Sequence, residues 1–266
     1  MDSKEIAKNY LKGFTKALVS LLQESTYDLV VAPANSGSAM IVFAEIIAQA
    51  ARIDLPRTLI LPIFSNRPGS PKFDNHSLVQ KIIHNSQLET SYRKILFVDD
   101  EMGDGYNLAT CIGLLQSANK IALGATCTIL SEGGSGWEYP LPNITTDFLP
   151  YAIRPANQWK NIMFNLLPDY MLQDFQNKVD FRLSPKEATC LVFSLPLKDL
   201  VGSEPYLNYE MLNRAEKRMP TLGVYQKQWL EIVAGIISES LLELENKEKA
   251  KVQLEKTIFG KLLFDF

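Results

Sequence analysis

The sequence of 266 residues contains only three cysteines and two histidines, so it is poor in the side chains that build disulfide frameworks and zinc sites. Cys111, Cys127 and Cys190 are widely spaced, and no Cys-x-x-Cys pair occurs. His76 and His84 are too far apart in sequence to form the i, i+4 pair that binds a metal on one helix face. These absences argue against a disulfide-stabilised secreted domain and a zinc module, and we expect a reducing, cytoplasmic environment.

The chain also lacks a strong excess of charge of either sign. It has 27 Lys and Arg residues against 30 Asp and Glu residues, a formal net charge of −3, and no basic patch that would bind a phosphate backbone. Its apolar runs end well short of the ~18 residues that a membrane span requires. The charged N-terminal segment, residues 1–5, lacks the apolar stretch of a signal peptide. We therefore expect neither a nucleic-acid partner nor a membrane partner.

What the sequence does contain is an alternation of apolar runs and amphipathic segments in its first 130 residues. Continuous β-branched and apolar runs are typical of strands that are covered on both faces of a sheet. Four such runs predict strands, at residues 29–32, 58–64, 95–98 and 121–130. Helical patterns occupy residues 6–23, 40–51 and 106–117. This order predicts an α/β fold with a mainly parallel sheet and flanking helices, a three-layer core of the Rossmann type.

The character of the sequence changes after Leu130. A glycine-rich segment and several prolines predict an irregular connection, with a plain loop at residues 143–145. We expect an α/β domain over residues 1–150 and a mostly helical region over residues 151–266. In the last predicted helix, apolar residues form a stripe from Trp229 to Leu244, which indicates intramolecular packing or, alternatively, a homodimer interface.

The segment with the clearest chemical pattern is Ile95–Leu108. An apolar strand ends in two adjacent carboxylates, Asp99 and Asp100, and a glycine-containing turn then leads into the helix at Tyr106. Ligands of open α/β sheets bind at this carboxyl edge. Carboxylates there bind hydroxyl groups or hydrated Mg²⁺, and a helix N-terminus binds phosphate. A ligand that carries a ribose and a phosphate would match both features.

At these residues the sequence resembles the type I phosphoribosyltransferases, whose signature is four apolar residues, two acidic residues and a short loop that usually ends in Thr-Gly-x-Thr. The resemblance implies that Asp99 and Asp100 contact the ribose hydroxyls of phosphoribosyl pyrophosphate (PRPP), directly or through Mg²⁺. It also implies that the next loop surrounds the 5′-phosphate, with the residues Gly103, Asp104, Gly105, Tyr106 and Asn107. The implied activity is transfer of the phosphoribosyl group to a nitrogenous base or amine.

Two further segments match the same family by their position in the chain. Asn35, Ser36 and Gly37 follow the first predicted strand, where the family has its pyrophosphate loop. Arg67 and Lys72 lie in the segment that corresponds to the family's flexible loop, and they would neutralise the leaving pyrophosphate. Exposed solvated charges are the alternative interpretation of these two residues. Together with the acidic pair, the matches cover roughly residues 25–135.

The loop departs from the family pattern at three positions, which leaves a second function open. Asp104 replaces a hydroxyl residue, Asn107 replaces the later threonine, and Gly103 stands where some members carry a general base. An inward-pointing Asp104 would repel a phosphate. These differences favour, as an alternative, a non-catalytic regulator that binds a nucleotide or sugar phosphate. They are also compatible with a ligand that has a hydroxyl or amine in place of the phosphate.

Two readings of the acidic pair do not involve PRPP. In the first interpretation, Asp99 and Asp100 simply end a strand, and Asp104 or Asn107 caps the next helix. In the second, the segment from Lys94 onward resembles the first strand and acidic pair of phosphoacceptor receiver domains. A receiver of that kind would begin near residue 94 and needs further strands after residue 150.

Overall fold

The computed structural model describes residues 3–33, 36–61, 63, 76–89, 91–101, 105–133, 143–152, 165–185, 188–189, 191 and 209–264. Its centre is a five-stranded parallel sheet with the strand order β2-β1-β3-β4-β5. The strands are β1 (Leu29–Pro33), β2 (Thr58–Leu61), β3 (Tyr92–Glu101), β4 (Ile121–Glu132) and β5 (Ile144–Ala152). The predicted α/β fold with a parallel sheet is confirmed.

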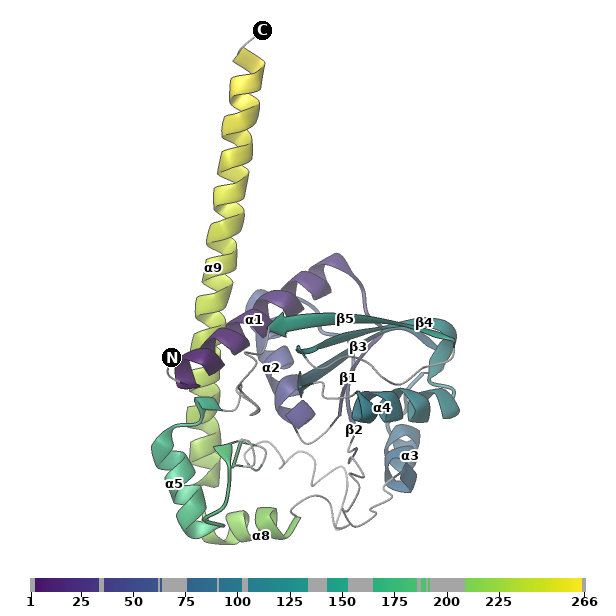
Figure 1. The fold of residues 1–266 in the computed structure, drawn as a ribbon, viewed down its shortest axis with the longest axis vertical. Coiled ribbons are helices and arrows are strands. Elements are labelled where there is room, and N and C mark those ends of the chain that lie inside the picture. Colours follow the sequence, from purple (N-terminus) through teal and green to yellow (C-terminus); the bar gives the residue numbers. More distant parts are fainter. Residues whose placement is uncertain are drawn as a thin grey trace.

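Helices cover both faces of this sheet (Figure 1). Strand side chains alternate between the two faces, so Val30, Leu96 and Val98 join one apolar core while Val31 and Phe97 join the other. The first core is covered by α1 (Ser3–Glu24), α2 (Ser36–Ala51), α5 (Asp169–Lys178), α8 (Tyr209–Arg218) and α9 (Leu222–Phe264). The second is covered by α3 (His76–Asn85) and α4 (Tyr106–Ser117). The double coverage explains why the inner strands are continuously apolar.

β5 is the element that the sequence pattern did not reveal. Residues 144–152 were expected to be part of an irregular connection, but they pair in parallel with β4 over the register Ala125–Ile144 to Glu132–Ala152. Within the described residues, β5 is an edge strand, so one of its sides pairs with no other strand. Such a strand tolerates Pro150, which has no backbone N–H to donate. The expectation of a loop at residues 143–145 is therefore wrong from Ile144 onward.

The C-terminal helices pack on the same apolar core as the sheet. Trp229 and Val233 on α9 are fully buried in the core that also contains Val30, Leu96 and Leu130. The apolar stripe of α9 therefore packs within the molecule, as the first of its two interpretations predicted. The division at residue 150 stays a prediction, and β5 continues across that position. Figure 1 shows that the C-terminal part of α9 extends beyond the sheet and the other helices.

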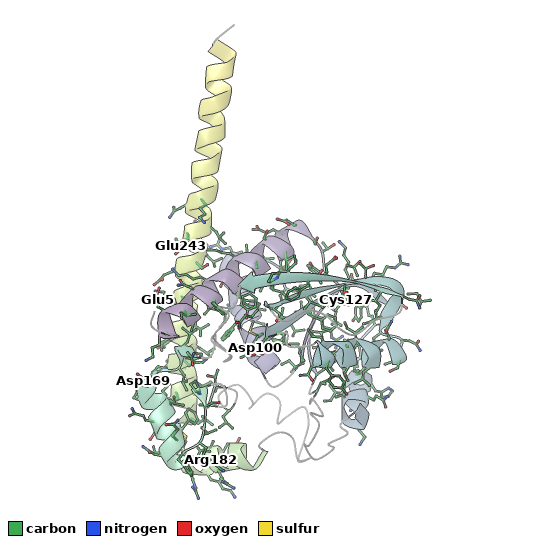
Figure 2. The ribbon with its side chains drawn as sticks, viewed as in Figure 1. Glu5, Asp100, Cys127, Asp169, Arg182 and Glu243 are labelled. Carbon is green, nitrogen blue, oxygen red and sulfur yellow. The ribbon has the colours of Figure 1, made fainter. Side chains whose placement is uncertain are left out.

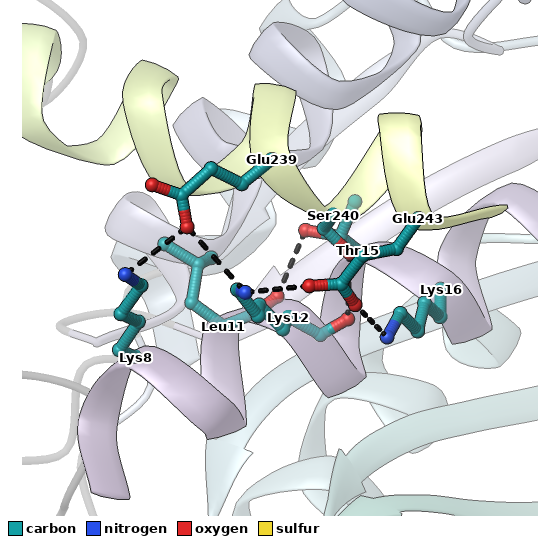
Figure 3. A network of polar contacts seen from close by, with 8 residues as sticks. All are labelled: Lys8, Leu11, Lys12, Thr15, Lys16, Glu239, Ser240 and Glu243. Carbon is teal, nitrogen blue, oxygen red and sulfur yellow. Dashed lines mark hydrogen bonds and ion pairs between the residues drawn. The ribbon is translucent and has the colours of Figure 1, made fainter. Parts of the chain in front are cut away.

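A row of ion pairs joins α1 to α9 at the rim of this core (Figure 3). Glu239 accepts contacts from Lys8 at 3.0 Å and Lys12 at 3.4 Å, while Glu243 binds Lys12 and Lys16, each at 2.7 Å. The lysines and the glutamates each recur every four residues, so both sets lie along facing helix surfaces. The hydrogen bonds to Lys12 and Lys16 lower the pKa of Glu243 to about 2.

Within the described residues, no helix combines the length and apolar character that a bilayer crossing requires.

Candidate functional site at the carboxyl edge of the sheet

The strand order creates a switch point between β1 and β3. The chain leaves β1 into α2 on one face of the sheet and leaves β3 into α4 on the other face. Because the connecting helices diverge there, open α/β sheets bind ligands between the carboxyl ends of these two strands. β1 and β3 are paired at Val31 and Phe97, two residues before Pro33 and Asp99 in their strands. The predicted pyrophosphate and ribose segments thus follow neighbouring strands at one edge.

Asp99 and Asp100 are buried at the end of β3, with exposed fractions of 6% and 3%. The β3–β4 ladder shifts register between Val98 and Glu101, so β3 contains an extra residue there. Such a bulge redirects side chains near functional edges. The Asp100 amide donates to Asp99 Oδ1 at 2.9 Å, which fixes one carboxylate oxygen at the bulge. Figure 2 places Asp100 at the carboxyl edge of the sheet, near α2.

The two carboxylates influence groups on different faces of the sheet. Burial and then the Asp99 carboxylate raise the pKa of the Cys111 thiol, on α4, well above its usual value. Burial, followed by the charges of Asp100, Glu132 and Asp99, raises the pKa of the Tyr151 hydroxyl, on β5. The charge of Asp100 raises the pKa of Tyr151 more than the charge of Asp99 does. The two carboxylates therefore lie close enough to α4 and β5 to influence groups on both elements.

The N-terminus of α4 has the properties of an anion site. Gly105 is its N-cap residue with φ 86°, in the left-handed region that glycine tolerates best, and a glycine has no side chain that could cap the helix. Helix N-termini offer backbone N–H groups and a partial positive charge to phosphates. The Oδ1 atom of Asn107 is buried and has no hydrogen-bond partner among the described residues. A ligand N–H or O–H group would satisfy this acceptor.

Gly37 lies in the first turn of α2 and is explained by packing alone. A Cβ atom at this position would lie 2.9 Å from Ala32 Cβ and 3.0 Å from the Ala32 carbonyl carbon. Glycine is therefore required for α2 to begin so close to the end of β1. Ser36 is the first residue of α2, at the carboxyl edge of β1 as the sequence predicted.

Three residues at this edge were missed by the sequence analysis. Ser131 and Glu132, at the end of β4, are 0% and 1% exposed. Tyr151 occupies a second bulge, because β4–β5 pairing passes from Ser131–Pro150 to Glu132–Ala152 and leaves Tyr151 unmatched. Its hydroxyl donates to the backbone carbonyl of Asp100 at 2.9 Å. The available signal was the polar pair that directly follows the apolar run of β4, the same pattern that singled out Asp99 and Asp100.

Five predicted site residues lie outside the described part of the chain. They are Asn35 of the pyrophosphate segment, Arg67 and Lys72 of the basic segment, and Gly103 and Asp104 of the phosphate loop. The receiver interpretation does not fit the described fold. In that interpretation the strand at residue 94 would be the first of its domain, whereas β3 is the central strand of a sheet that begins with β1.

The donor set at the edge is compatible with magnesium. Mg²⁺ is usually held by one or two carboxylates together with substrate phosphates and water. Asp99 and Asp100 offer carboxylate oxygens of this kind. Among the described residues, no group of three or more His, Cys, Asp or Glu side chains is arranged to hold a metal ion by itself. The residues therefore fit an ion that is bound jointly with substrate oxygens better than a preformed metal centre.

Comparisons with known proteins find similarities among solved structures. The chain is similar to a Helicobacter pylori xanthine-guanine-hypoxanthine phosphoribosyltransferase, with 12% sequence identity over 53% of this chain and 83% of that chain. The TM-score is 0.27, which is too low to support a structural argument. No family model matches the chain, and no curated protein matches it. The fold assignment therefore rests on the strand order and the helical layers.

Proposed function

We propose that the chain binds PRPP, or a related ribose phosphate, together with Mg²⁺ and transfers the phosphoribosyl group to a nitrogenous base or amine. The observation that carries this proposal is the succession of a buried acidic pair and a helix N-terminus that begins at Gly105, at the switch point of the sheet. Carboxylates accept hydrogen bonds from ribose hydroxyls, and the helix N-terminus attracts the phosphate on the other side of the same sugar.

In this proposal Asp99 and Asp100 bind the ribose hydroxyls, and they hold the metal with the oxygens of the substrate. The backbone N–H groups at Tyr106 and Asn107 donate to the 5′-phosphate. Arg67 and Lys72 neutralise the pyrophosphate, and Asn35, Ser36 and Gly37 surround it. When bound, Mg²⁺ would supply further neutralisation of the pyrophosphate charge.

The proposed reaction exchanges one bond at C1 of ribose. The bond from C1 to the pyrophosphate oxygen breaks, and pyrophosphate leaves with the bonding electrons. The acceptor nitrogen forms the new bond to C1 and then releases a proton to solvent. The sugar carries positive charge in the transition state, so nearby buried carboxylates stabilise it.

Calorimetric titration of the full chain with PRPP and Mg²⁺ tests the binding step. The double variant Asp99→Asn, Asp100→Asn should bind PRPP at least about 100-fold more weakly, because two hydrogen bonds to charged groups are lost. The matched control is Asp54→Asn with Asp147→Asn, which removes two negative charges from exposed positions. Equal PRPP affinity of the wild type and the Asp99, Asp100 double variant contradicts the proposal.

Asp104 and Gly103 favour a second candidate, a regulator that binds the sugar phosphate without turnover. Asp104 adds negative charge to the predicted phosphate loop, and Gly103 offers no general base. Release of pyrophosphate from PRPP, measured with a panel of bases and amines, separates the two functions. Turnover with any acceptor supports the transferase, whereas tight binding with no turnover supports the regulator.

A further inference from the structure

Tyr151 reaches the acidic pair from two strands away. β5 pairs only with β4 within the described residues, yet the Tyr151 hydroxyl donates to the Asp100 carbonyl of β3 at 2.9 Å. The reach depends on the bulge at Tyr151, which leaves this residue without a partner on β4. The side chain therefore crosses the carboxyl end of β4 to bind the backbone of the next strand.

The acceptor of this hydrogen bond lies where the β3–β4 ladder is interrupted. Regular pairing is present up to Val98 with Leu130 and resumes at Glu101 with Glu132. Asp99 and Asp100 lie between these pairs, where the register of β3 with β4 is irregular. The hydrogen bond from Tyr151 supplies a tertiary contact at that point and restrains the backbone that carries both carboxylates.

The ring and the backbone of Tyr151 both contact α1. The ring packs edge-on against Phe14, with ring centroids 5.3 Å apart and an interplanar angle of 74°. A Cβ atom at Gly13 would lie 2.6 Å from the backbone oxygen of Tyr151, so α1 contacts the backbone of β5 directly. The residue is 9% exposed. A donor with these restraints is suited to fixing the position of another chain segment.

We propose that Tyr151 is a positioning residue, which holds the bulge of β3 so that Asp99 and Asp100 are arranged for a ribose phosphate before it binds. The ligand class rests on the proposed function. The positioning role itself rests on the hydrogen bond to Asp100 and on the two bulges. Tyr151 need not touch the substrate, because its effect passes through the backbone of Asp100.

The variant Tyr151→Phe removes only the hydroxyl, and Tyr27→Phe is its matched control. The Tyr27 hydroxyl donates to Thr128 Oγ1 on β4 at 3.2 Å, so the control loses the same chemical group from another part of the sheet. We expect both variants to unfold at slightly lower urea concentration. Only Tyr151→Phe should weaken binding of PRPP with Mg²⁺, by about tenfold, as measured by calorimetry. Affinity within about twofold of the wild type overturns the proposal.

Hydrogen exchange of the peptide that contains residues 99–101 provides a readout without ligand. Exchange should be faster in Tyr151→Phe than in the wild type and unchanged in Tyr27→Phe. If the wild type does not bind PRPP, the proposed function fails, and this measurement alone decides the positioning role. Faster exchange then supports the role, and unchanged exchange in Tyr151→Phe refutes it.

Discussion

Glu239 and Glu243 lie on the exposed side of α9 beside three lysines of α1, whereas Asp99, Asp100 and Glu132 are buried at the ends of β3 and β4. Exposed ion pairs cost little desolvation, and they contribute little to stability. Buried carboxylates carry a desolvation cost that apolar residues would avoid. The three buried residues are the only buried charged residues in the described part of the chain. Their concentration at one sheet edge indicates a functional constraint, while the α1–α9 contact is explained by packing.

The largest effect is expected from the core beneath α9. Trp229 is fully buried, so Trp229→Ala should lower the free energy of unfolding by about 3–5 kcal/mol. Trp229→Phe should cost much less, because Nε1 of Trp229 is buried without a hydrogen-bond partner among the described residues. Urea unfolding measures both values. PRPP affinity of the folded Trp229→Phe variant should equal that of the wild type. A large loss of affinity would mean that the core beneath α9 and the acidic edge of the sheet are not independent.

Gly13 lies on α1, between the contact of α1 with α9 and the contact of α1 with β5. Gly13→Ala should destabilise the protein by about 1–3 kcal/mol, because the new methyl group would collide with the Tyr151 backbone oxygen, 2.6 Å from the Cβ position. Gly235→Ala on α9 is the control, since a Cβ atom there has no neighbour within 4 Å. The control should gain up to about 1 kcal/mol from the higher helix propensity of alanine. Similar stability changes for the two variants would mean that α1 does not press on β5.

At the sheet edge the backbone of Gly105 provides the next test. Its φ of 86° costs an alanine about 1–2 kcal/mol, so Gly105→Ala should be destabilised by that amount. Gly113→Ala, in the same helix, should instead be stabilised by about 0.5–1 kcal/mol, because that position is exposed and open. Thermal unfolding of both variants measures the difference. Equal melting temperatures would contradict the left-handed conformation of Gly105 at the start of α4.

The sheet could be predicted where it is covered on both faces. Residues 29–32 and 95–98 are continuous apolar runs because helices bury them from two sides, and the helix at residues 106–117 was predicted with its observed bounds. β5 lacks that signal, since it is an edge strand with exposed residues such as Asp147 and Pro150. Its pattern resembles a loop until it is placed beside β4.

The acidic pair of the candidate site was visible in the sequence because it directly follows an apolar strand. Tyr151 was not visible as part of the same site. Its relation to Asp100 arises from the order of β3, β4 and β5 and from two bulges, and none of these leaves a local pattern in the chain. Glu132 was assigned to the glycine-rich connection because Gly133 and Gly134 follow it, although it ends β4 beside Glu101.

The smallest effect is expected at the exposed ion pairs, and it should depend on pH and salt. Glu243 has a pKa of about 2 in the folded protein against an ordinary value of 4.5, so its ionised form stabilises the fold above pH 4.5. That contribution is lost as pH falls through about 2. Glu243→Gln should therefore be less stable than the wild type at neutral pH and low salt, with the difference shrinking on acidification and at high salt.

Urea unfolding over a range of pH and salt concentration measures this difference. The control is Glu231→Gln on the same helix, because Glu231 is exposed and forms no ion pair within the described residues. The control should show no comparable dependence on pH or salt. A constant stability difference between the wild type and Glu243→Gln across both series would mean that Glu243 acts through packing. The charge of this exposed carboxylate would then contribute nothing to stability.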